Sequence, residues 1–172
     1  MRRSKATAFL ACLVTAGSAV ANVAAAPPTK SAITIAIPDL GCNSLGEGTF
    51  EARGWSWGAE LVPNEAFPER EKAELAGLVL TRGTDACSPA LLRSLLMGVH
   101  QRELRLSQYD TNGVLKSTLS MLNVKVTDWH IAADAASADA AEQVTLTGAR
   151  FTFTDVASGA SFCWEMDQMR RC

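Results

Sequence analysis

Apolar and polar side chains alternate with a period of two through most of this chain. The clearest run begins at Ala32, where Ile33, Ile35 and Ile37 share one face until Pro38 ends the alternation. Side chains two residues apart lie on the same face of an extended strand, so this pattern predicts β-structure with one buried face. The same period recurs farther along the chain, at residues 49–61, 78–81, 104–106, 120–127, 144–153 and 162–166. The chain is therefore predicted to fold mainly as antiparallel β-structure.

The second alternating run contains two of the four tryptophans, in the sequence Gly-Trp-Ser-Trp-Gly at residues 54–58. Both indoles project from one face of a strand because they are two residues apart. The flanking glycines allow another backbone to approach closely, and each indole N–H needs a hydrogen-bond partner. Trp55 and Trp57 are therefore predicted to lie either in the sheet core or on a packing surface between subunits.

Residues 88–100 alone have the periodicity of an amphipathic helix. Ser88 and Pro89 begin it, because serine is favoured at the N-cap and proline at the first helical position. An apolar stripe follows, which consists of Leu91, Leu92, Leu95, Leu96 and Val99. The helix is expected to end at Gly98 to His100, with one face buried against the β-structure.

The segments between the alternating runs carry turn or loop signals. Residues 62–73 contain two prolines and a charged run, which predicts a solvated loop with one helical turn at most. Residues 110–113 end in Asn-Gly, which indicates a tight β-hairpin. Residues 132–141 are mostly Ala, Asp and Ser and are predicted to form a mobile loop. The inward parity changes within residues 144–153, so a β-bulge is expected at residues 148–149.

The beginning of the chain has the features of a secretory signal peptide. Three cations precede an apolar run, and residues 19–21 read Ala-Val-Ala, the small-x-small pattern of a cleavage site. We expect cleavage after Ala21, because cleavage after Ala26 would leave Pro27 next to the cut. The apolar run is short for a bilayer span and no later stretch is long enough, so no membrane span is expected after removal of the signal.

The predicted organisation is a signal peptide at residues 1–21, a flexible N-terminal arm at residues 22–31 and one domain at residues 32–172. We expect the domain to be a closed or nearly closed antiparallel barrel with one flanking amphipathic helix. Three of the 16 Lys and Arg residues lie in the signal and none of the 18 Asp and Glu residues do, which leaves 13 cations against 18 acids. A mildly acidic domain without a basic patch is not expected to bind nucleic acid.

Cysteine usage agrees with export to the periplasm or the cell exterior. Cys12 leaves with the signal, and an even number of cysteines remains in the domain: Cys42, Cys87, Cys163 and Cys172. In an oxidising compartment four cysteines predict two disulfides, for which three connectivities are open. The spacings fit no zinc pattern, so neither a metal nor a cofactor is expected.

Sequence signals for catalysis are weak. Asp128 and His130 place an acid and an imidazole close together at a strand end, but no nucleophile-elbow sequence accompanies them. A phosphate-binding loop, a dinucleotide fingerprint and the H-E-x-x-H zinc motif are missing as well. His130 is most simply a polar residue at a strand terminus, and the chain is not expected to be an enzyme.

Five segments in the same order resemble the Hcp family, the hemolysin-coregulated tube proteins of bacterial type VI secretion systems. They are the opening strand Ile33 to Gly41, the tryptophan strand Arg53 to Gly58, the strand-to-helix segment Leu80 to Leu91, the strand Glu142 to Leu146 and the aromatic strand Phe162 to Trp164. The resemblance extends from Ile33 to Asp167. It implies a two-sheet β-barrel with a flanking helix, hexameric rings, and a stacked tube that carries or chaperones secreted effectors.

Head-to-tail rings require apolar strand faces that meet a neighbour. Trp55, Trp57, Leu78 and Leu80 are therefore the candidates for the subunit interface or the core. Two features differ from the family pattern: the chain has a leader, and the charged residues 62–73 stand where the family has a long glycine-rich loop. The alternative is a monomeric periplasmic binding or adaptor barrel, stabilised by disulfides, with no role in a tube.

Overall fold

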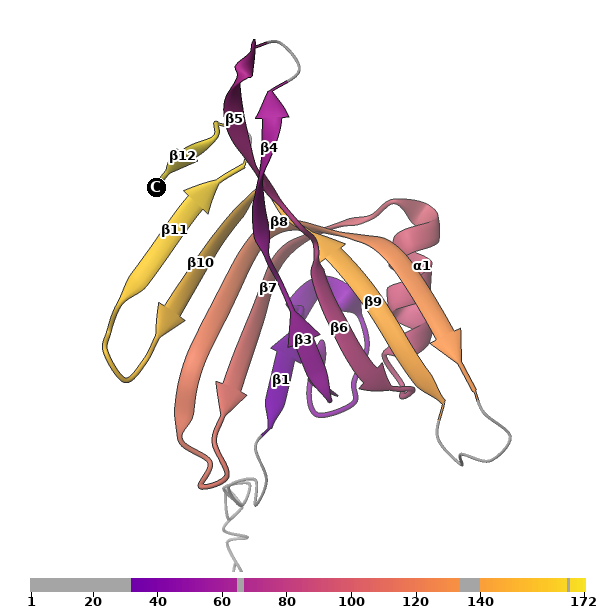
Figure 1. The fold of residues 1–172 in the computed structure, drawn as a ribbon. Helices are drawn as coiled ribbons and strands as arrows, with labels where there is room; N and C mark the ends of the chain where they lie inside the picture. Colours follow the sequence, from indigo (N-terminus) through magenta and orange to yellow (C-terminus); the bar gives the residue numbers. More distant parts are fainter. Residues whose placement is uncertain (1–31, 65–66, 134–139, 167) are drawn as a thin grey trace, which may run out of the picture.

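The computed structural model describes residues 32–64, 67–133, 140–166 and 168–172. In these residues an α-helix, α1 (Ser88–Met97), and a short 3-10 helix, η1 (Pro38–Leu40), accompany twelve strands (Figure 1). The strands are β1 (Ile33–Ala36), β2 (Thr49–Ala52), β3 (Gly54–Ser56), β4 (Ala59–Asn64), β5 (Phe67–Leu75), β6 (Leu78–Gly83), β7 (His100–Tyr109), β8 (Leu115–Ala132), β9 (Ala141–Thr147), β10 (Arg150–Asp155), β11 (Ser161–Glu165) and β12 (Arg170–Arg171).

Ten strands form one antiparallel sheet around the long strand β8. One edge of β8 pairs with β7. The other edge pairs first with β10 and then with β9. Beyond β7 lie β1 and β2, beyond β10 lie β11 and β12, and beyond β9 lie β6 and β3. The prediction of a mainly β, antiparallel fold with one flanking helix is confirmed.

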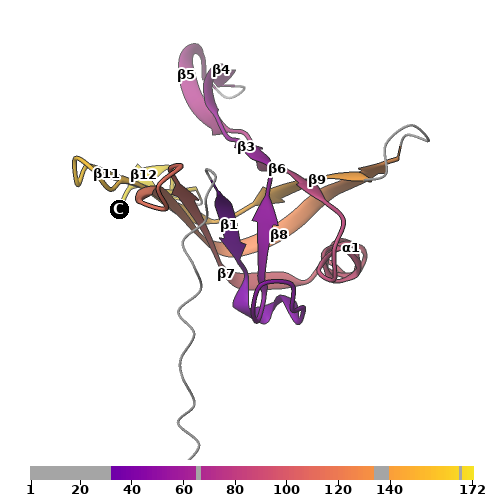
Figure 2. The same ribbon diagram turned by 90° about the horizontal axis from the view of Figure 1, so that it is seen from below.

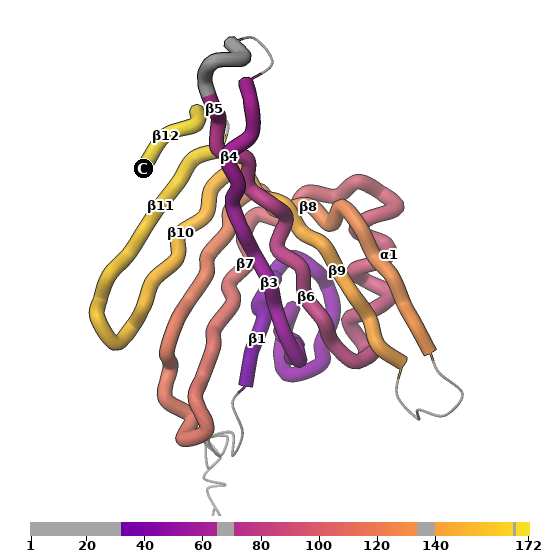
Figure 3. Tube along the Cα trace, in the orientation of Figure 1, coloured from indigo at the N-terminus to yellow at the C-terminus, as the bar shows by residue number. Residues whose placement is uncertain are grey.

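The sheet is folded into two wings. Figure 3 shows that β8 bends sharply where its partner changes from β10 to β9. At the bend the buried side chains of β8 change parity, from Leu119 and Met121 to Val124 and Val126. Asn123 lies between them with a φ of 53°, the left-handed conformation that asparagine tolerates better than most residues.

The neighbouring strands change parity at the same level. Strand β7 is buried at Gln101 and then at Leu104, and the buried face passes from Leu146 in β9 to Phe151 in β10. The bend therefore runs across β7, β8 and the junction of β9 with β10.

The phase shift predicted within residues 144–153 is present, but the predicted bulge is wrong. The register with β8 is the same on both sides of residues 148–149, so no extra residue lies there. The extra residue is Thr127 in β8, where the pairing shifts by one. Gly148 lies in a tight space, because a Cβ at this position would lie 3.1 Å from the carbonyl oxygen of Leu122.

Two end strands of the sheet, β2 and β3, are joined by the backbone of Arg53 and not by strand pairing. Strand β2 pairs with β1 and β3 pairs with β6, but β2 and β3 are not paired with each other. Arg53 joins the two strands, and its backbone N–H donates to the carbonyl oxygen of Thr81 at 2.7 Å. The predicted barrel is therefore nearly closed rather than fully closed by hydrogen bonds, and both wings enclose one core.

The helix begins and ends differently from the prediction. Cys87 occupies the N-cap position without a side-chain cap, and Ser88 is the first helical residue. Gly98 caps the C-terminus with a φ of 62°, and His100 already belongs to β7. The expected apolar stripe is buried only in part, because Leu91 is fully buried whereas Leu96 is 76% exposed.

The predicted loop at residues 62–73 is wrong, because this segment belongs to the hairpin of β4 and β5. These two strands form a sheet of their own, with Ala59 opposite Leu75 and Val62 opposite Lys72. The hairpin projects beyond the bend of the main sheet (Figure 1).

Several expectations concern residues outside the described ranges. They are the signal peptide, its cleavage after Ala21, the arm at residues 22–31 and the middle of the predicted loop at residues 132–141. Within the described ranges, no helix has both the length and the apolar character that a bilayer crossing requires.

Candidate functional site

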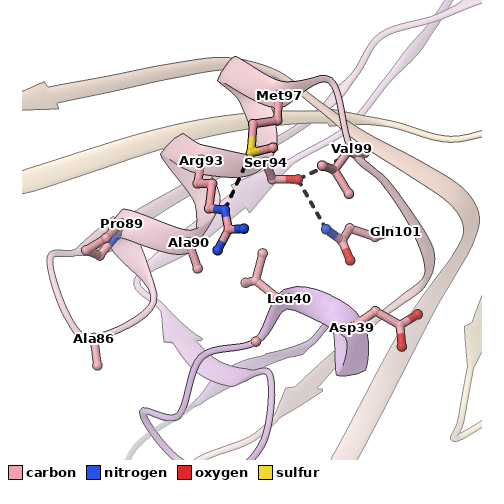
Figure 4. Close-up of a pocket in the computed structure, with 11 residues that line it drawn as sticks. Asp39, Leu40, Ala86, Pro89, Ala90, Arg93, Ser94, Met97, Val99 and Gln101 are labelled. Carbon is pink, nitrogen blue, oxygen red and sulfur yellow. Dashed lines mark hydrogen bonds between the residues drawn. The ribbon is translucent and has the colours of Figure 1, made fainter.

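An open groove lies between η1, helix α1 and the first residues of β7 (Figure 4). It encloses about 480 Å³. Much of its lining is apolar and consists of Leu40, Pro89, Ala90, Met97 and Val99. Met97 is 64% exposed and Val99 40% exposed, and the neighbouring Leu96 adds a further exposed side chain. The C-terminal end of α1 thus presents apolar surface to solvent beside the groove.

Arg93 supplies a positive charge to this groove. Its guanidinium extends from α1 toward Leu40 (Figure 4), and its Nε lies 3.5 Å from Met97 Sδ. No carboxylate among the described residues lies within ion-pair distance of Arg93. Asp39 also lines the groove, and its Oδ2 lies 3.8 Å from Nε of Arg102. The part of the groove at Arg93 is therefore suited to an apolar group that is accompanied by a carboxylate.

Polar side chains hold the wall of the groove that the start of β7 forms. Gln101 donates from Nε2 to Ser94 Oγ at 3.2 Å, and Ser94 Oγ donates to the carbonyl oxygen of Val99 at 3.4 Å. Both side chains are buried, so these bonds hold the start of β7 against α1.

The hairpin of β4 and β5 is the second exposed feature. Leu61 is 67% exposed, and Glu60, Glu71 and Glu74 are exposed as well. Residues 59–75 contain five glutamates against one arginine and one lysine, so the hairpin is acidic. The base is anchored, because Leu75 packs against the core. A hairpin of two strands has little stability of its own in water, so burial against a partner would stabilise it.

Hairpin and groove lie on opposite sides of the molecule. Figure 2 shows β4 and β5 on one side of the sheet, and α1 with the segment after β1 on the other. A contact between the two features therefore requires two molecules.

A fully buried ion pair links β6 to β9. Arg82 and Glu142 are both 0% exposed, and Arg82 Nε lies 4.0 Å from Glu142 Oε2. Glu142 also accepts hydrogen bonds of 2.5 Å from Ser88 Oγ and from Trp129 Nε1. The guanidinium of Arg82 stacks on the ring of Phe50, with 4.1 Å from Cζ to the ring centroid. The two carboxylate oxygens of Glu142 thus connect β9 to β6, β8 and α1.

Asp85 extends this cluster to the surface. Its Oδ1 forms an ion pair with Arg82 and accepts the backbone N–H of Cys87 at 2.7 Å, and its Oδ2 accepts the hydroxyl of Ser44 at 2.8 Å. Partial burial acts to raise the pKa of Asp85, but the hydrogen bonds from Cys87 and Ser44 and the charge of Arg82 together lower it. Asp85 is therefore held as a carboxylate.

Two disulfides lie at different depths. Cys42 pairs with Cys87, which ties the loop after η1 to the start of α1. Cys163 pairs with Cys172, which ties β11 to the segment that contains β12. The first pair lies in the hydrophobic core and the second at the edge of the sheet.

The sequence model of the family described as "Type VI secretion system effector, Hcp" matches residues 43–154, about two thirds of the chain. The chain belongs to the Hcp family. No curated protein sequence matches it, so the Hcp assignment rests on the family model, with which the fold agrees.

Solved structures of Hcp proteins have the same fold. The Hcp1 protein from Salmonella typhimurium superposes with a TM-score of 0.72 at 15% identity, covering 83% of this chain and 99% of the other. A type VI secretion system effector from Yersinia pestis has a TM-score of 0.63 at 18% identity, with coverage of 77% and 98%. The secreted protein Hcp3 from Pseudomonas aeruginosa has a TM-score of 0.58 at 18% identity, with coverage of 78% and 97%.

In this Hcp fold the four apolar residues singled out from the sequence lie in or against the core. Leu78 and Leu80 are 0% exposed, and Trp55 and Trp57 are half-buried and pack on the core. The ring of Trp57 meets Phe151 edge to face, with 4.6 Å between centroids. Leu78 and Leu80 are thus covered within the monomer, and the two tryptophans retain partial exposure.

The acid and imidazole at the end of β8 remain isolated in the Hcp fold. His130 Nε2 lies 3.1 Å from Asp128 Oδ2, and the two side chains are 71% and 49% exposed. Within the described ranges no three His, Cys, Asp or Glu side chains are grouped as metal ligands would be.

Sequence reasoning missed the groove and the buried ion pair of this Hcp protein. The groove combines η1 with α1 and β7, which are separated by about fifty residues and meet only in the fold. For the ion pair a signal was present: Arg82 and Glu142 both stand at inward positions of alternating strands, where a charge requires a buried partner.

Proposed function

We propose that this Hcp-family chain is an exported structural subunit that assembles head to tail into rings and carries or chaperones secreted effector proteins. The observation that carries the proposal is the acidic hairpin of β4 and β5, which stands outside the main sheet with Leu61 exposed. An exposed, isolated hairpin is stabilised when it packs on a partner, and a second copy of the same chain offers a suitable surface.

The complementary surface is the groove at α1. It combines apolar lining with Arg93, which lacks a carboxylate partner among the described residues, and the hairpin combines Leu61 with exposed glutamates. Because hairpin and groove are different patches on opposite sides of the molecule, their contact is heterologous, and a heterologous contact closes into a ring or continues as a filament.

Export is supported by the sequence of residues 1–21, which has the features of a leader, and by the two disulfides, which form and persist in oxidising compartments. We therefore place the mature protein in the periplasm or outside the cell. A structural role accords with the absence of catalytic sequence motifs, and the Asp128 and His130 pair lies open to solvent.

The deciding experiment is the native mass of the mature, oxidised protein, measured by light scattering at several concentrations. We expect a six-fold mass that persists on dilution. A monomer at every concentration would overturn the assembly proposal.

A monomer would favour the second candidate, a disulfide-stabilised binding or adaptor barrel. This candidate is supported by a core that is complete within one chain, where Leu78 and Leu80 are fully buried, and by the open groove beside α1. In that case the groove would be the place to search for a ligand.

A further inference from the structure

The two disulfides differ in their accessibility to thiols. Cys87 is 0% exposed and Cys42 is 9% exposed, and both belong to the hydrophobic core. Cys163 is half-buried and Cys172 is exposed. Thiol–disulfide exchange requires a thiolate to reach a sulfur atom, so the pair at the sheet edge is open to attack whereas the core pair is shielded.

Few other interactions hold the segment that Cys172 fastens. Strand β12 has two residues, and among the described residues their strand partners are Trp164 and Glu165. The backbone N–H of Cys172 donates to the carbonyl oxygen of Cys163 at 3.3 Å. Arg170 Nε lies 3.2 Å from Glu165 Oε2, but its side chain is 64% exposed, and exposed ion pairs contribute little.

The segment covers an otherwise free edge of the sheet. Strand β11 pairs with β10 along one side, and β12 covers part of the other side. Phe162 on β11 is 47% exposed and stacks on Trp164, with 6.1 Å between centroids. A free edge beside the exposed ring of Phe162 is a site for strand addition, and the basic residues of β12 cover it as edge residues often do.

We propose that the Cys163–Cys172 disulfide is a site of thiol–disulfide exchange with dithiols, and that its reduction uncovers the edge of β11. A thiolate of the dithiol attacks the Sγ of Cys172, forms a mixed disulfide and releases the thiolate of Cys163. The second thiol of the dithiol then displaces Cys172, so the dithiol is oxidised to its disulfide and both cysteines are reduced by two electrons in total. The thiolates take up the two protons that the dithiol loses.

The test uses the full mature chain and dithiothreitol as the dithiol. After limited reduction, free thiols are alkylated and located by peptide mass spectrometry. We expect Cys163 and Cys172 to be alkylated at dithiol concentrations at least tenfold below those that open Cys42–Cys87. Equal reduction of both pairs, or earlier reduction of the core pair, would overturn the assignment.

Backbone hydrogen exchange on the selectively reduced, alkylated protein tests the second step. We expect faster exchange in β11 and β12, with unchanged exchange in β7 and β8. Protection that persists in β11 after reduction would show that the segment stays in place and would contradict an uncovered edge. The double variant Cys163→Ser/Cys172→Ser provides the matched control, because added dithiol should not accelerate its exchange in β11 further. These readouts do not depend on ring assembly or on cargo.

Discussion

At the scale of single residues, the ion pair of Arg82 and Glu142 places two charged groups in the core, where each needs its partners. Both side chains are fully buried, and Glu142 also accepts from Ser88 and Trp129. A buried pair adds less to stability than its Coulomb energy suggests, but removal of Glu142 leaves Arg82 with Asp85 alone and takes the hydrogen-bond acceptor away from Ser88 and Trp129.

We therefore expect Glu142→Ala to lower the free energy of unfolding by about 3–5 kcal/mol. Urea unfolding followed by tryptophan fluorescence measures the loss, since Trp129 donates to this carboxylate. Glu60→Ala on the exposed hairpin is the control and should change stability by less than about 0.5 kcal/mol. A loss at Glu142 as small as that of the control would contradict the structural role of the pair.

Asp85 predicts a dependence of stability on pH. Its folded pKa lies below its ordinary value of 3.8, so the charged carboxylate stabilises the fold fully above that value. This contribution is lost as the pH falls below the ordinary value and through the lower folded pKa. Between about pH 6 and about pH 3 the stability of Asp85→Asn should fall by less than that of the unmodified protein. Equal pH dependence in urea unfolding of both proteins would refute the assignment.

At the scale of elements, Gly98 determines how α1 ends. Its φ of 62° is the left-handed conformation in which other residues are strained, and no atom lies within 4 Å of a Cβ placed there. Gly98→Ala should therefore cost about 1 kcal/mol through the backbone alone. Gly58→Ala is a matched control, because Gly58 has equal space without a left-handed φ. Thermal unfolding of the two variants should separate them, and equal midpoints would count against this account.

Elements governed by local chemistry could be predicted from the sequence. Period-two alternation predicted the strands of the main sheet apart from the two-residue β12, although the run at residues 49–61 is divided among β2, β3 and β4. The Asn-Gly signal predicted the hairpin between β7 and β8. There Asp110 Oδ1 accepts the backbone N–H groups of Asn112 and Val114, and Gly113 takes a φ of 75°. Turn chemistry of this kind acts within a few residues, so it is visible without the rest of the fold.

Elements governed by distant partners could not be predicted in this way. Ser88 has the side chain of a good N-cap, but its hydroxyl bonds to Glu142, which lies 54 residues away. Strand β4 contains Pro63, which argues against a strand, yet each strand of a two-stranded sheet has a free edge where a missing N–H is tolerated. The groove around Arg93 likewise exists only once η1, α1 and β7 are assembled.

At the scale of the whole molecule, the proposed head-to-tail assembly predicts that the charge of Arg93 is needed for the contact between copies. Arg93→Glu would oppose the acidic hairpin of a neighbouring copy, so we expect the six-fold mass to fall toward the monomer. Lys125→Glu reverses another exposed positive charge, on β8 and outside the lining of the groove, and should leave the mass unchanged. Light scattering of both variants, with circular dichroism to confirm folding, makes the comparison. An intact ring in Arg93→Glu would show that the groove is not the contact.

The bend across β7, β8 and the junction of β9 with β10 limits how this protein can change in length. On each side of the bend buried and exposed side chains alternate, apart from the bulge at Thr127, and the buried parity next to the bend differs between the two wings. Loss or gain of one residue in β8 at Asn123 would turn one half of that strand inside out, so that its apolar side chains would face water. At the bend, insertions and deletions are therefore tolerable only in even numbers, or when the same change is made in β7, in β8 and at the junction of β9 with β10. The positions of the buried residues therefore fix how the two wings face each other, although β2 and β3 are not paired with each other.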